Sequence, residues 1–438
     1  MKIIRPLAID LFCGAGGMSE GIMQAGFHIV YSNEINADAA LTYSKRHEQL
    51  GLIQGKNTYL EVNDVRYISG HNILKNIENL SDVNCKNGIE AIFGGPPCQG
   101  FSRAGKQETN DIRNTLFQDY LRIISEIKPK YIVFENVLGI QDVKFINYVS
   151  LFDKELYKSK TALYIIENEL RKINYISKIN ILNASDYGVP QNRNRLIIIG
   201  YRSDCVEPYF PSKHGGIVTL EDAISDLSGN KKKSKYQKES IHGRTLSLKT
   251  GMPILCKKLF NNEKTNHKKY IEERFCLLNV GETISQLKKR IYSEGIDIGM
   301  YKNLLNYACT KINKTEKETI DIFKNRTFSE NELNILLTKK NSRIKLNPKK
   351  PSSTIMTLPD DIISPYDNRI FSVRELARLQ SFDDSFKFYG KRTTGTHMRK
   401  HEVPQYSQVG NAIPPLLAKA IAEEILIAIN KTNKIIKE

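Results

Sequence analysis

The chain has 438 residues, of which 40% are hydrophobic, and its formal net charge is +17. This length exceeds what one hydrophobic core usually serves, so we expect two domains or one domain with a large insertion. No apolar run approaches the ~20 residues of a membrane span, and Arg5, Pro6 and Asp10 interrupt the N-terminal segment, which argues against a membrane protein and a signal peptide. The positive charge favours a polyanionic partner such as nucleic acid, with merely solvated lysines as the alternative.

The seven cysteines are scattered and include no Cys-x-x-Cys pair. That pattern argues against a disulfide framework and against a zinc ribbon. We therefore expect a protein of a reducing, cytoplasmic compartment, without a bound metal.

The first half of the chain alternates short apolar segments with helix-length segments. Strands are expected at residues 7–12, 27–34, 89–93, 131–134 and 195–200, and a helix is expected at 18–25. Such an alternation predicts an α/β fold with a parallel sheet covered on both faces. Ligands of such sheets lie beyond the carboxyl ends of the strands, which is where the unusual residues of this chain cluster.

The pattern changes after residue 211. Thr219 can cap a short helix that continues through Asp226, and a long basic region of weak periodicity follows. Helical periodicity returns at 374–379 and at 414–427. We expect an α/β domain at 1–229, a basic middle domain at 230–351, and a C-terminal segment at 352–438 that returns to complete the first domain.

The loop after the first expected strand has the residue types of a nucleotide-binding turn. Its glycines, in Gly14-Ala15-Gly16-Gly17, permit a ligand to approach the backbone, and the following helix N-terminus favours negative charge. Glu34 could accept hydrogen bonds from two ribose hydroxyls, and Asp64 could accept one from an exocyclic amine. These features suit NAD, FAD or S-adenosylmethionine, and Phe12 and Val65 could equally be core residues.

A cysteine follows two prolines at the end of an expected strand, in Gly95-Pro96-Pro97-Cys98. Prolines fix φ and donate no hydrogen bond, so they stiffen the loop and present the thiol. Glu135 ends a buried strand, where burial would raise its pKa and let it carry a proton near neutrality. A thiol and a protonatable carboxyl at neighbouring strand ends suit addition to an electron-poor heteroaromatic ring. A structural cysteine is the alternative.

Two arginines lie at the start of the last expected strand. Gln191-Asn192-Arg193-Asn194-Arg195 places two guanidinium groups on one side of that strand. They suit contacts to a phosphate or a ring carbonyl, and surface salt bridges are the alternative.

Distinctive residue patterns are spread over nearly the whole chain. They occupy, in this order, residues 10–17, 94–102, 135–137, 191–195, 374–382 and 408–414. Together they resemble the ordered motifs of the bacterial DNA (cytosine-5)-methyltransferases of restriction-modification systems. The resemblance implies a doubly wound, Rossmann-like domain that binds S-adenosylmethionine and flips a cytosine out of the duplex. It also implies a smaller inserted target-recognition domain at 230–351.

The resemblance assigns roles to individual residues. Cys98 would add to C6 of cytosine, Glu135 would engage N3 and the 4-amino group, and Arg193 and Arg195 would steady the base and the covalent adduct. Addition makes C5 nucleophilic, so that C5 takes the sulfonium methyl, and loss of its proton with β-elimination then releases the cysteine. The expected cofactor-binding residues are Asp10, Phe12, Cys13, Gly14, Ala15, Gly16, Gly17, Glu34, Asp64, Val65, Gly95, Pro97, Leu116, Asn411 and Ala412.

The expected partner is double-stranded DNA. Gln99 and Ser102 would lie on a mobile loop that closes over it, and the basic residues of 230–351 would neutralise phosphates while other side chains contact base edges. A solvated helix face is the alternative for each lysine cluster. We further expect a monomer in the bacterial cytoplasm, paired in function with a restriction endonuclease.

Other functions fit less well. An RNA cytosine-5 methyltransferase is disfavoured by the long recognition region. A nucleotide-binding oxidoreductase would leave Cys98, Glu135 and the paired arginines without a role. A catalytically silent DNA-binding protein is disfavoured because Cys98 and Glu135 are both intact.

Overall fold

A seven-stranded sheet forms the centre of the computed structural model, which describes residues 5–85, 88–97, 115–230, 232–395, 398 and 402–435. The strands lie in the order β3-β2-β1-β4-β5-β9-β8. They are β1 (Leu7–Leu11), β2 (His28–Asn33), β3 (Tyr59–Glu61), β4 (Ala91–Gly94), β5 (Tyr131–Asn136), β8 (Tyr175–Asn183) and β9 (Asn194–Arg202). Each strand expected from the sequence is present.

The sheet is mixed, which corrects the expectation of a parallel sheet. Strands β1 to β5 pair in parallel, whereas β9 runs antiparallel to both β5 and β8. The connection from Asn183 to Asn194 contains only a short 3-10 helix (Ala184–Tyr187). A parallel neighbour would need a crossover of a dozen or more residues, so this short connection makes β9 run back along β8.

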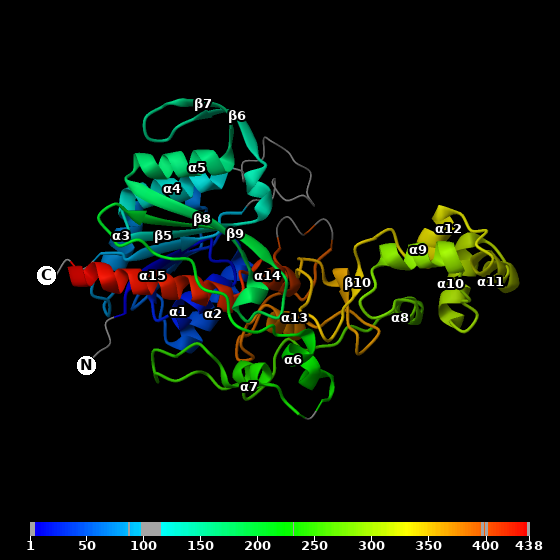
Figure 1. The fold of residues 1–438 in the computed structure, drawn as a ribbon. Coiled ribbons are helices and arrows are strands. Elements are labelled where there is room, and N and C mark those ends of the chain that lie inside the picture. Colours follow the sequence, from blue (N-terminus) through cyan, green and yellow to red (C-terminus); the bar gives the residue numbers. More distant parts are fainter. Residues whose placement is uncertain are drawn as a thin grey trace.

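Helices cover both faces of the sheet (Figure 1). Helices α3 (Gly70–Glu78), α4 (Leu116–Ile127) and α5 (Ala162–Lys172) pack on one face, and α1 (Gly17–Gln24) and α15 (Pro415–Ile435) pack on the other. Because strand side chains alternate, Ile132 and Phe134 enter the first core while Tyr131 and Val133 enter the second. The expected doubly wound domain is therefore confirmed.

The C-terminal helix α15 lies directly against α1, so the two ends of the chain share one core (Figure 1). A Cβ on Gly17 would lie 2.4 Å from the carbonyl oxygen of Ile413, and one on Gly21 would lie 2.4 Å from that of Pro415. Only glycine permits two backbones to approach this closely. The glycines of α1 thus determine how the C-terminal segment returns to the sheet.

Several elements lie outside the sheet layers. They are the hairpin strands β6 (Lys144–Val149) and β7 (Leu156–Thr161), and α6 (Leu220–Ile224). Helix α2 (Ala37–Leu50) packs beside α1, since Tyr43 is hydrogen-bonded to Ser19 and Leu50 joins the second core. The expected cap of α6 is present, because Thr219 and Asp222 form a reciprocal capping box. The helix then continues as a 3-10 turn (Ser225–Ser228).

The start of the basic region packs on the C-terminal segment. Helix α7 (Lys235–His242) lies beside α13 (Val373–Leu379), and α14 (Gln405–Asn411) follows α13 in the same layer. The hydroxyl of Tyr236 donates to the carbonyl of Arg378 at 2.6 Å. Arg244 forms an ion pair with the buried Asp383 at 2.6 Å. These contacts join residues 235–244 to the α/β part.

Residues 269–337 form a separate helical lobe that projects from the α/β part (Figure 1). It contains α8 (Lys269–Cys276), α9 (Ile284–Glu294), α10 (Lys302–Ile312), α11 (Glu316–Lys324) and α12 (Glu330–Leu336). Its own core includes Leu287, Leu304 and Phe323. Strand β10 (Ile344–Lys345) leads back from the lobe and pairs with β11 (Ile362–Ile363).

Within the described ranges, no helix has both the length and the apolarity of a membrane span. The same residues contain no group of three or more His, Cys, Asp and Glu side chains placed to hold a metal ion.

Candidate active site and cofactor-binding end

The expected site residues follow neighbouring strands at one edge of the sheet. Asp10 lies in β1, Glu34 follows β2, Gly95 follows β4, and Glu135 lies near the end of β5. Because these strands are parallel neighbours, their carboxyl ends meet. The expected nucleophile and DNA-contacting residues, Cys98, Gln99 and Ser102, lie outside the described residues.

Asn136 of β5 holds the segment that leads to Cys98. The amide nitrogen of the buried Asn136 donates to the carbonyl of Pro96 at 3.1 Å, while its oxygen accepts from the Val137 amide at 2.8 Å. A Cβ on Gly95 would lie 3.0 Å from Oε2 of Glu135. The loop therefore passes directly over the carboxyl group. Asn136 was given no role from the sequence, although a polar side chain at the end of a buried strand beside Glu135 was a usable signal.

Glu135 and Arg195 form a buried ion pair. Nε of Arg195 lies 2.8 Å from Oε1 of Glu135, and both side chains are 12% exposed. Burial raises the pKa of Glu135, and the charges of Arg195 and Arg193 act against that rise. The antiparallel pairing of β9 with β5 explains the contact, because it brings the start of β9 to the carboxyl edge of the sheet. A parallel β9 would have placed Arg195 at the opposite edge.

Arg193 makes contacts of a different kind. Its Nη1 donates to the carbonyl of Ile355 and its Nη2 to the carbonyl of Gly410, each at 3.0 Å. The side chain is buried, and burial together with the charge of Arg195 lowers its pKa well below the ordinary value. The two arginines expected to act together thus separate: Arg195 pairs with Glu135, and Arg193 binds the main chain of the C-terminal segment.

Two buried glutamines extend this connection. Gln191 donates to the side-chain oxygen of Gln380 at 2.8 Å and accepts from the amide of Ile355 at 2.9 Å. Gln380 in turn donates to the carbonyl of Val409 at 2.8 Å. A chain of amide contacts therefore holds the residues before β9 against the end of α14, where the expected cofactor residue Asn411 lies exposed and Ala412 lies buried.

The glycine-rich loop closes against Glu34. Oε2 of Glu34 accepts from the amide of Gly14 at 2.9 Å, and Oε1 accepts from the amide of Asn36 at 2.7 Å. Burial raises the pKa of this carboxyl, and main-chain hydrogen bonds from Asn36, Gly14 and Ile35 act against the rise. Gly14 and Gly16 have φ values of 56° and 100°, and the space where a Cβ of Gly14 would lie is open. These two positions favour glycine by conformation.

Several other residues expected to bind a cofactor are buried within or beside the glycine-rich loop. Asp10 is buried and accepts a hydrogen bond from the hydroxyl of Ser19. Burial raises the pKa of Asp10 to about 7 and raises that of the buried Cys13 well above its usual range. Ala15 is buried as well, and Gly17 faces Ile413. These residues shape the loop from within.

The remaining cofactor candidates lie around the same edge. Phe12 and Leu116 are half-buried, Val65 is buried, and Pro97 is the last described residue before Cys98. The carboxylate of Asp64 is engaged by the guanidinium of Arg66, with Nη2 2.5 Å from Oδ2. Ile35, which the sequence interpretation omitted, is 63% exposed beside Glu34. An exposed apolar side chain next to a carboxylate can pack on a flat heterocycle, and its position directly after Glu34 was the available signal.

The site can do two things chemically. The carboxylate of Glu34 accepts main-chain bonds from Gly14 and Asn36, and its remaining acceptor capacity can serve hydroxyls above the open space at Gly14. Glu135, held at one oxygen by Arg195, can present the other to a ring nitrogen. The residues therefore fit a ribose-bearing cofactor beside a proton-carrying carboxyl group.

A family model described as C-5 cytosine-specific DNA methylase matches residues 7–427. The chain belongs to this family. It is a DNA (cytosine-5)-methyltransferase with the fold and activity that the sequence predicted, and the RNA-directed alternative is not favoured.

Named relatives agree with this assignment, and a solved structure shares the fold. Over 95% of its length the chain is 31% identical to the type II methyltransferase M.DdeI of Desulfomicrobium norvegicum, covering 88% of that protein. It is 30% identical to M1.HphI of Haemophilus parahaemolyticus, again over 95% of the chain and 86% of the relative. A solved structure named as a DNA modification methyltransferase from a prophage (E. coli) shares the fold, with a TM-score of 0.62 and 23% identity over 97% of this chain and 99% of the other.

Proposed function

We propose that this cytosine-5 methyltransferase modifies one cytosine within a specific duplex sequence, with Cys98 as nucleophile and Glu135 as the proton-carrying group. The observation that carries the proposal is the buried Glu135–Arg195 pair beneath the Gly95 backbone. A flipped cytosine above Gly95 would present N3 to Glu135 while its C6 faces the loop that ends in Cys98.

The cysteine and the carboxyl group act on opposite parts of the ring. The Cys98 thiolate forms a bond to C6, and the electron pair of the C5–C6 double bond moves toward C5 as Glu135 supports the charge at N3. S-adenosylmethionine supplies the methyl group that C5 takes. A water molecule or hydroxide from solvent then takes the C5 proton, the C5–H electron pair re-forms the C5–C6 double bond, and the sulfur–C6 bond breaks so that Cys98 leaves as thiolate.

Glu135 is suited to its role by burial and by its partner. Burial raises its pKa, so the carboxyl group can hold a proton closer to neutral pH. Arg195 fixes one oxygen at 2.8 Å, which leaves Oε2 oriented toward Gly95. A side chain at residue 95 would occupy the place of the base. Arg195 therefore orients the catalytic carboxyl, and its exposed atoms can reach the ring carbonyl.

Glu34, Gly14 and Asp64 would hold the cofactor. Glu34 would accept from the ribose hydroxyls above the open space at Gly14. Asp64 would accept from the exocyclic amine once Arg66 releases one of its oxygens, and Ile35 would pack on the ring. Phe12, Val65, Pro97, Leu116 and Asn411 would complete the pocket wall.

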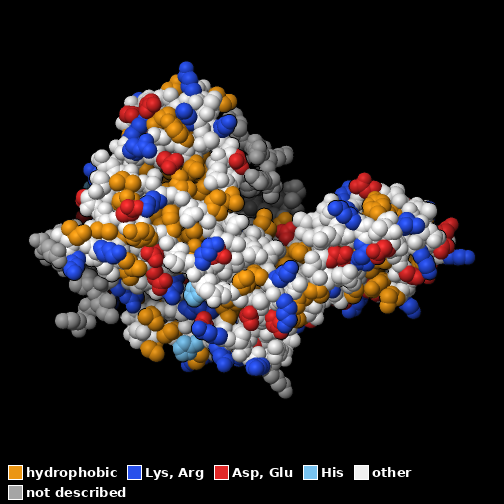
Figure 2. All heavy atoms as spheres, in the orientation of Figure 1, with side chains coloured by type: hydrophobic (Ala, Val, Ile, Leu, Met, Phe, Trp, Pro, Cys, Tyr) orange, Lys and Arg blue, Asp and Glu red, His pale blue; other side chains and the backbone are white. Residues whose placement is uncertain are grey.

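Residues 230–351 would select the DNA sequence. The helical lobe lies within this range, outside the α/β part. The excess of positive charge lies in the segments that flank the lobe, because the 11 Lys and Arg of residues 269–337 are nearly balanced by 10 Asp and Glu (Figure 2). Because the similar relatives are named as type II methyltransferases, we place this enzyme in a restriction-modification system, where its product would be resistant to a paired endonuclease.

Transfer of label tests the reaction and the nucleophile together. Tritiated S-adenosylmethionine and duplex DNA are incubated with the wild type, with Cys98→Ser and with the control Cys276→Ser, whose cysteine is exposed on the helical lobe. We expect label on DNA from the wild type and the control alone. DNA containing 5-fluorocytosine should become covalently bound to the same two proteins. Label from Cys98→Ser, or label on RNA only, would overturn the proposal.

A further inference from the structure

Asp64, the residue expected to hold the exocyclic amine of the cofactor, is already engaged by a residue of its own turn. Nε of Arg66 lies 3.0 Å from both carboxylate oxygens, and Nη2 lies 2.5 Å from Oδ2. The main-chain N–H of Arg66 also donates to Oδ1 at 3.0 Å. A carboxylate offers about four lone-pair sites, and these contacts use all of them. A further donor can bind Asp64 only after the guanidinium has moved.

The side chain of Arg66 can move without the turn that carries it. Arg122 of α4 donates to the carbonyls of Val65 at 3.1 Å and Ile68 at 2.9 Å, which fixes the main chain on both sides of Arg66. The Arg66 side chain itself is 42% exposed, and among the described residues Asp64 is its only hydrogen-bond partner. Movement of this side chain therefore breaks one exposed ion pair, which costs little free energy.

A second carboxylate lies beside the same turn. Nη2 of Arg122 contacts both the carbonyl of Val65 and, at 3.0 Å, Oδ1 of Asp119, so Asp119 is a close neighbour of the turn. Its Oδ2 has no hydrogen-bond partner in the described part of the chain. Hydrogen bonding to Asp64 raises the pKa of Arg66, and the charges of Asp64 and Asp119 add to that rise. Asp119 is thus a second anionic partner within the electrostatic reach of Arg66.

Asp64 lies beside the residues that fit a ribose, because the ends of β2 and β3 run together. The amide of Glu34 donates to the carbonyl of Glu61 at 3.2 Å. One residue earlier, the side chain of Asn33 donates to the carbonyl of Asn63 at 2.8 Å. A nucleoside whose ribose is bound by Glu34 therefore places its base on the side of Asp64. The ion pair at Asp64 occupies the acceptor that the exocyclic amine of that base needs.

We propose that Arg66 sets the affinity for the cofactor by exchanging between Asp64 and Asp119, an inference that rests on the proposed function. In the protein without cofactor, Arg66 occupies Asp64. When the exocyclic amine donates to Asp64, the guanidinium moves to Oδ2 of Asp119. Because binding requires the first ion pair to open, the apparent affinity for S-adenosylmethionine and for its demethylated product is lowered, and the product leaves more readily. Arg66 is a positioning residue in this exchange, since it acts on the cofactor through Asp64.

Binding of S-adenosyl-L-homocysteine to the full chain, measured by calorimetry, tests the exchange. Arg66→Gln should lower Kd by about 2- to 5-fold, the effect of one exposed ion pair. Asp119→Asn should raise Kd, because the guanidinium then loses its second partner. In the double variant Arg66→Gln/Asp119→Asn, Kd should equal that of Arg66→Gln alone. Arg171→Gln and Asp82→Asn make the same charge changes at exposed sites elsewhere and should leave Kd unchanged.

A second ligand identifies the group for which Arg66 competes. The purine analogue of S-adenosyl-L-homocysteine, with hydrogen in place of the exocyclic amine, has no donor for Asp64. Arg66→Gln should therefore not tighten its binding. Equal tightening of both ligands would assign a general effect of charge and overturn the inference. Unchanged or weaker binding of S-adenosyl-L-homocysteine by Arg66→Gln would also overturn it.

The double variant separates the exchange from a structural effect of Asp119. If the loss caused by Asp119→Asn persisted in the absence of Arg66, it would act through Arg122 and the exchange would be wrong. A wild type without affinity for S-adenosyl-L-homocysteine would contradict the proposed function together with the inference. Binding by the wild type with no response to Arg66→Gln would contradict the inference alone.

Discussion

Nε of Arg195 lies 2.8 Å from Oε1 of Glu135, and the two residues come from strands that run in opposite directions. The pair lies at the edge of the sheet where β4 ends and Gly95 begins the segment that leads to Cys98. Burial favours the protonated carboxyl, whereas the guanidinium favours the carboxylate. The balance between these two effects determines whether Glu135 can carry a proton at the pH of the reaction.

Glu135→Gln should abolish most methyl transfer. The amide keeps the shape of the carboxyl group but cannot exchange a proton with N3 of cytosine. We expect kcat to fall by about 10²- to 10⁴-fold, the usual contribution of a positioned acid or base, while the affinity for S-adenosylmethionine stays within about twofold. Single-turnover transfer of tritiated methyl groups measures the first quantity and calorimetry the second. A variant that retained the wild-type rate would exclude Glu135 as the proton carrier.

Arg193→Ala should act on stability. Removing the guanidinium leaves the carbonyls of Ile355 and Gly410 without their donors in a buried place. We expect the free energy of unfolding to fall by about 2–5 kcal/mol. Urea unfolding followed by circular dichroism measures this change. If Arg193 acted on the base instead, as the sequence suggested, the variant would lose its rate with unchanged stability.

Ionisation of Asp10 should make the stability of the protein depend on pH. Burial raises its pKa from 3.8 to about 7, so between these values the folded protein holds a proton that the unfolded chain has released. Stability from this group is therefore complete below about pH 4 and is lost as the pH rises toward 7, by an amount on the order of 4 kcal/mol. Asp10→Asn cannot ionise and should lack this slope. Parallel slopes in urea titrations of the two proteins between pH 4 and 8 would contradict the assignment.

Gly21→Ala should destabilise the contact between α1 and α15. The added Cβ would lie 2.4 Å from the carbonyl oxygen of Pro415, so one helix must shift. We expect a loss of about 1–3 kcal/mol, as for other overpacked sites. Gly215→Ala is the matched control, because nothing lies within 4 Å of its Cβ position. Thermal unfolding of both variants compares them; equal melting temperatures would show that the helices can move apart freely.

Several features were accessible from the sequence because they depend on local chemistry. Short apolar runs predicted five strands, and the structure contains each of them. The positions of Glu34, Gly95 and Glu135 at the ends of strands predicted that these residues would lie close together. The helix cap at Thr219 could be predicted from neighbouring residues alone. The direction of β9 could not be predicted, since an apolar run has the same pattern in a parallel and an antiparallel strand. The wrong expectation of a parallel sheet came from that ambiguity.

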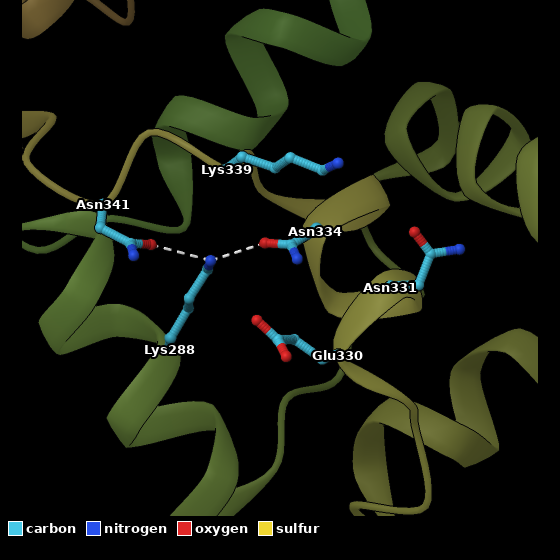
Figure 3. A pocket seen from close by; sticks show the side chains of 6 residues that line it. All are labelled: Lys288, Glu330, Asn331, Asn334, Lys339 and Asn341. Atoms are coloured by element: carbon cyan, nitrogen blue, oxygen red, sulfur yellow. Dashed lines mark hydrogen bonds between the residues drawn. The ribbon is translucent and has the colours of Figure 1, made fainter. Parts of the chain in front are cut away.

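The sequence by itself thus determined the fold class, the family and the residue types at the carboxyl edge of the sheet. Only the tertiary structure decided what Arg193 and Arg195 each bind, because their partners come from β5 and from residues 355 and 410, which no local pattern connects to β9. The same holds for the contacts of Lys288 with Asn334 and Asn341 on the helical lobe (Figure 3). Lys288, Asn334 and Asn341 meet there because the lobe folds around its own core, and contacts between distant segments depend on packing that sequence periodicity does not encode.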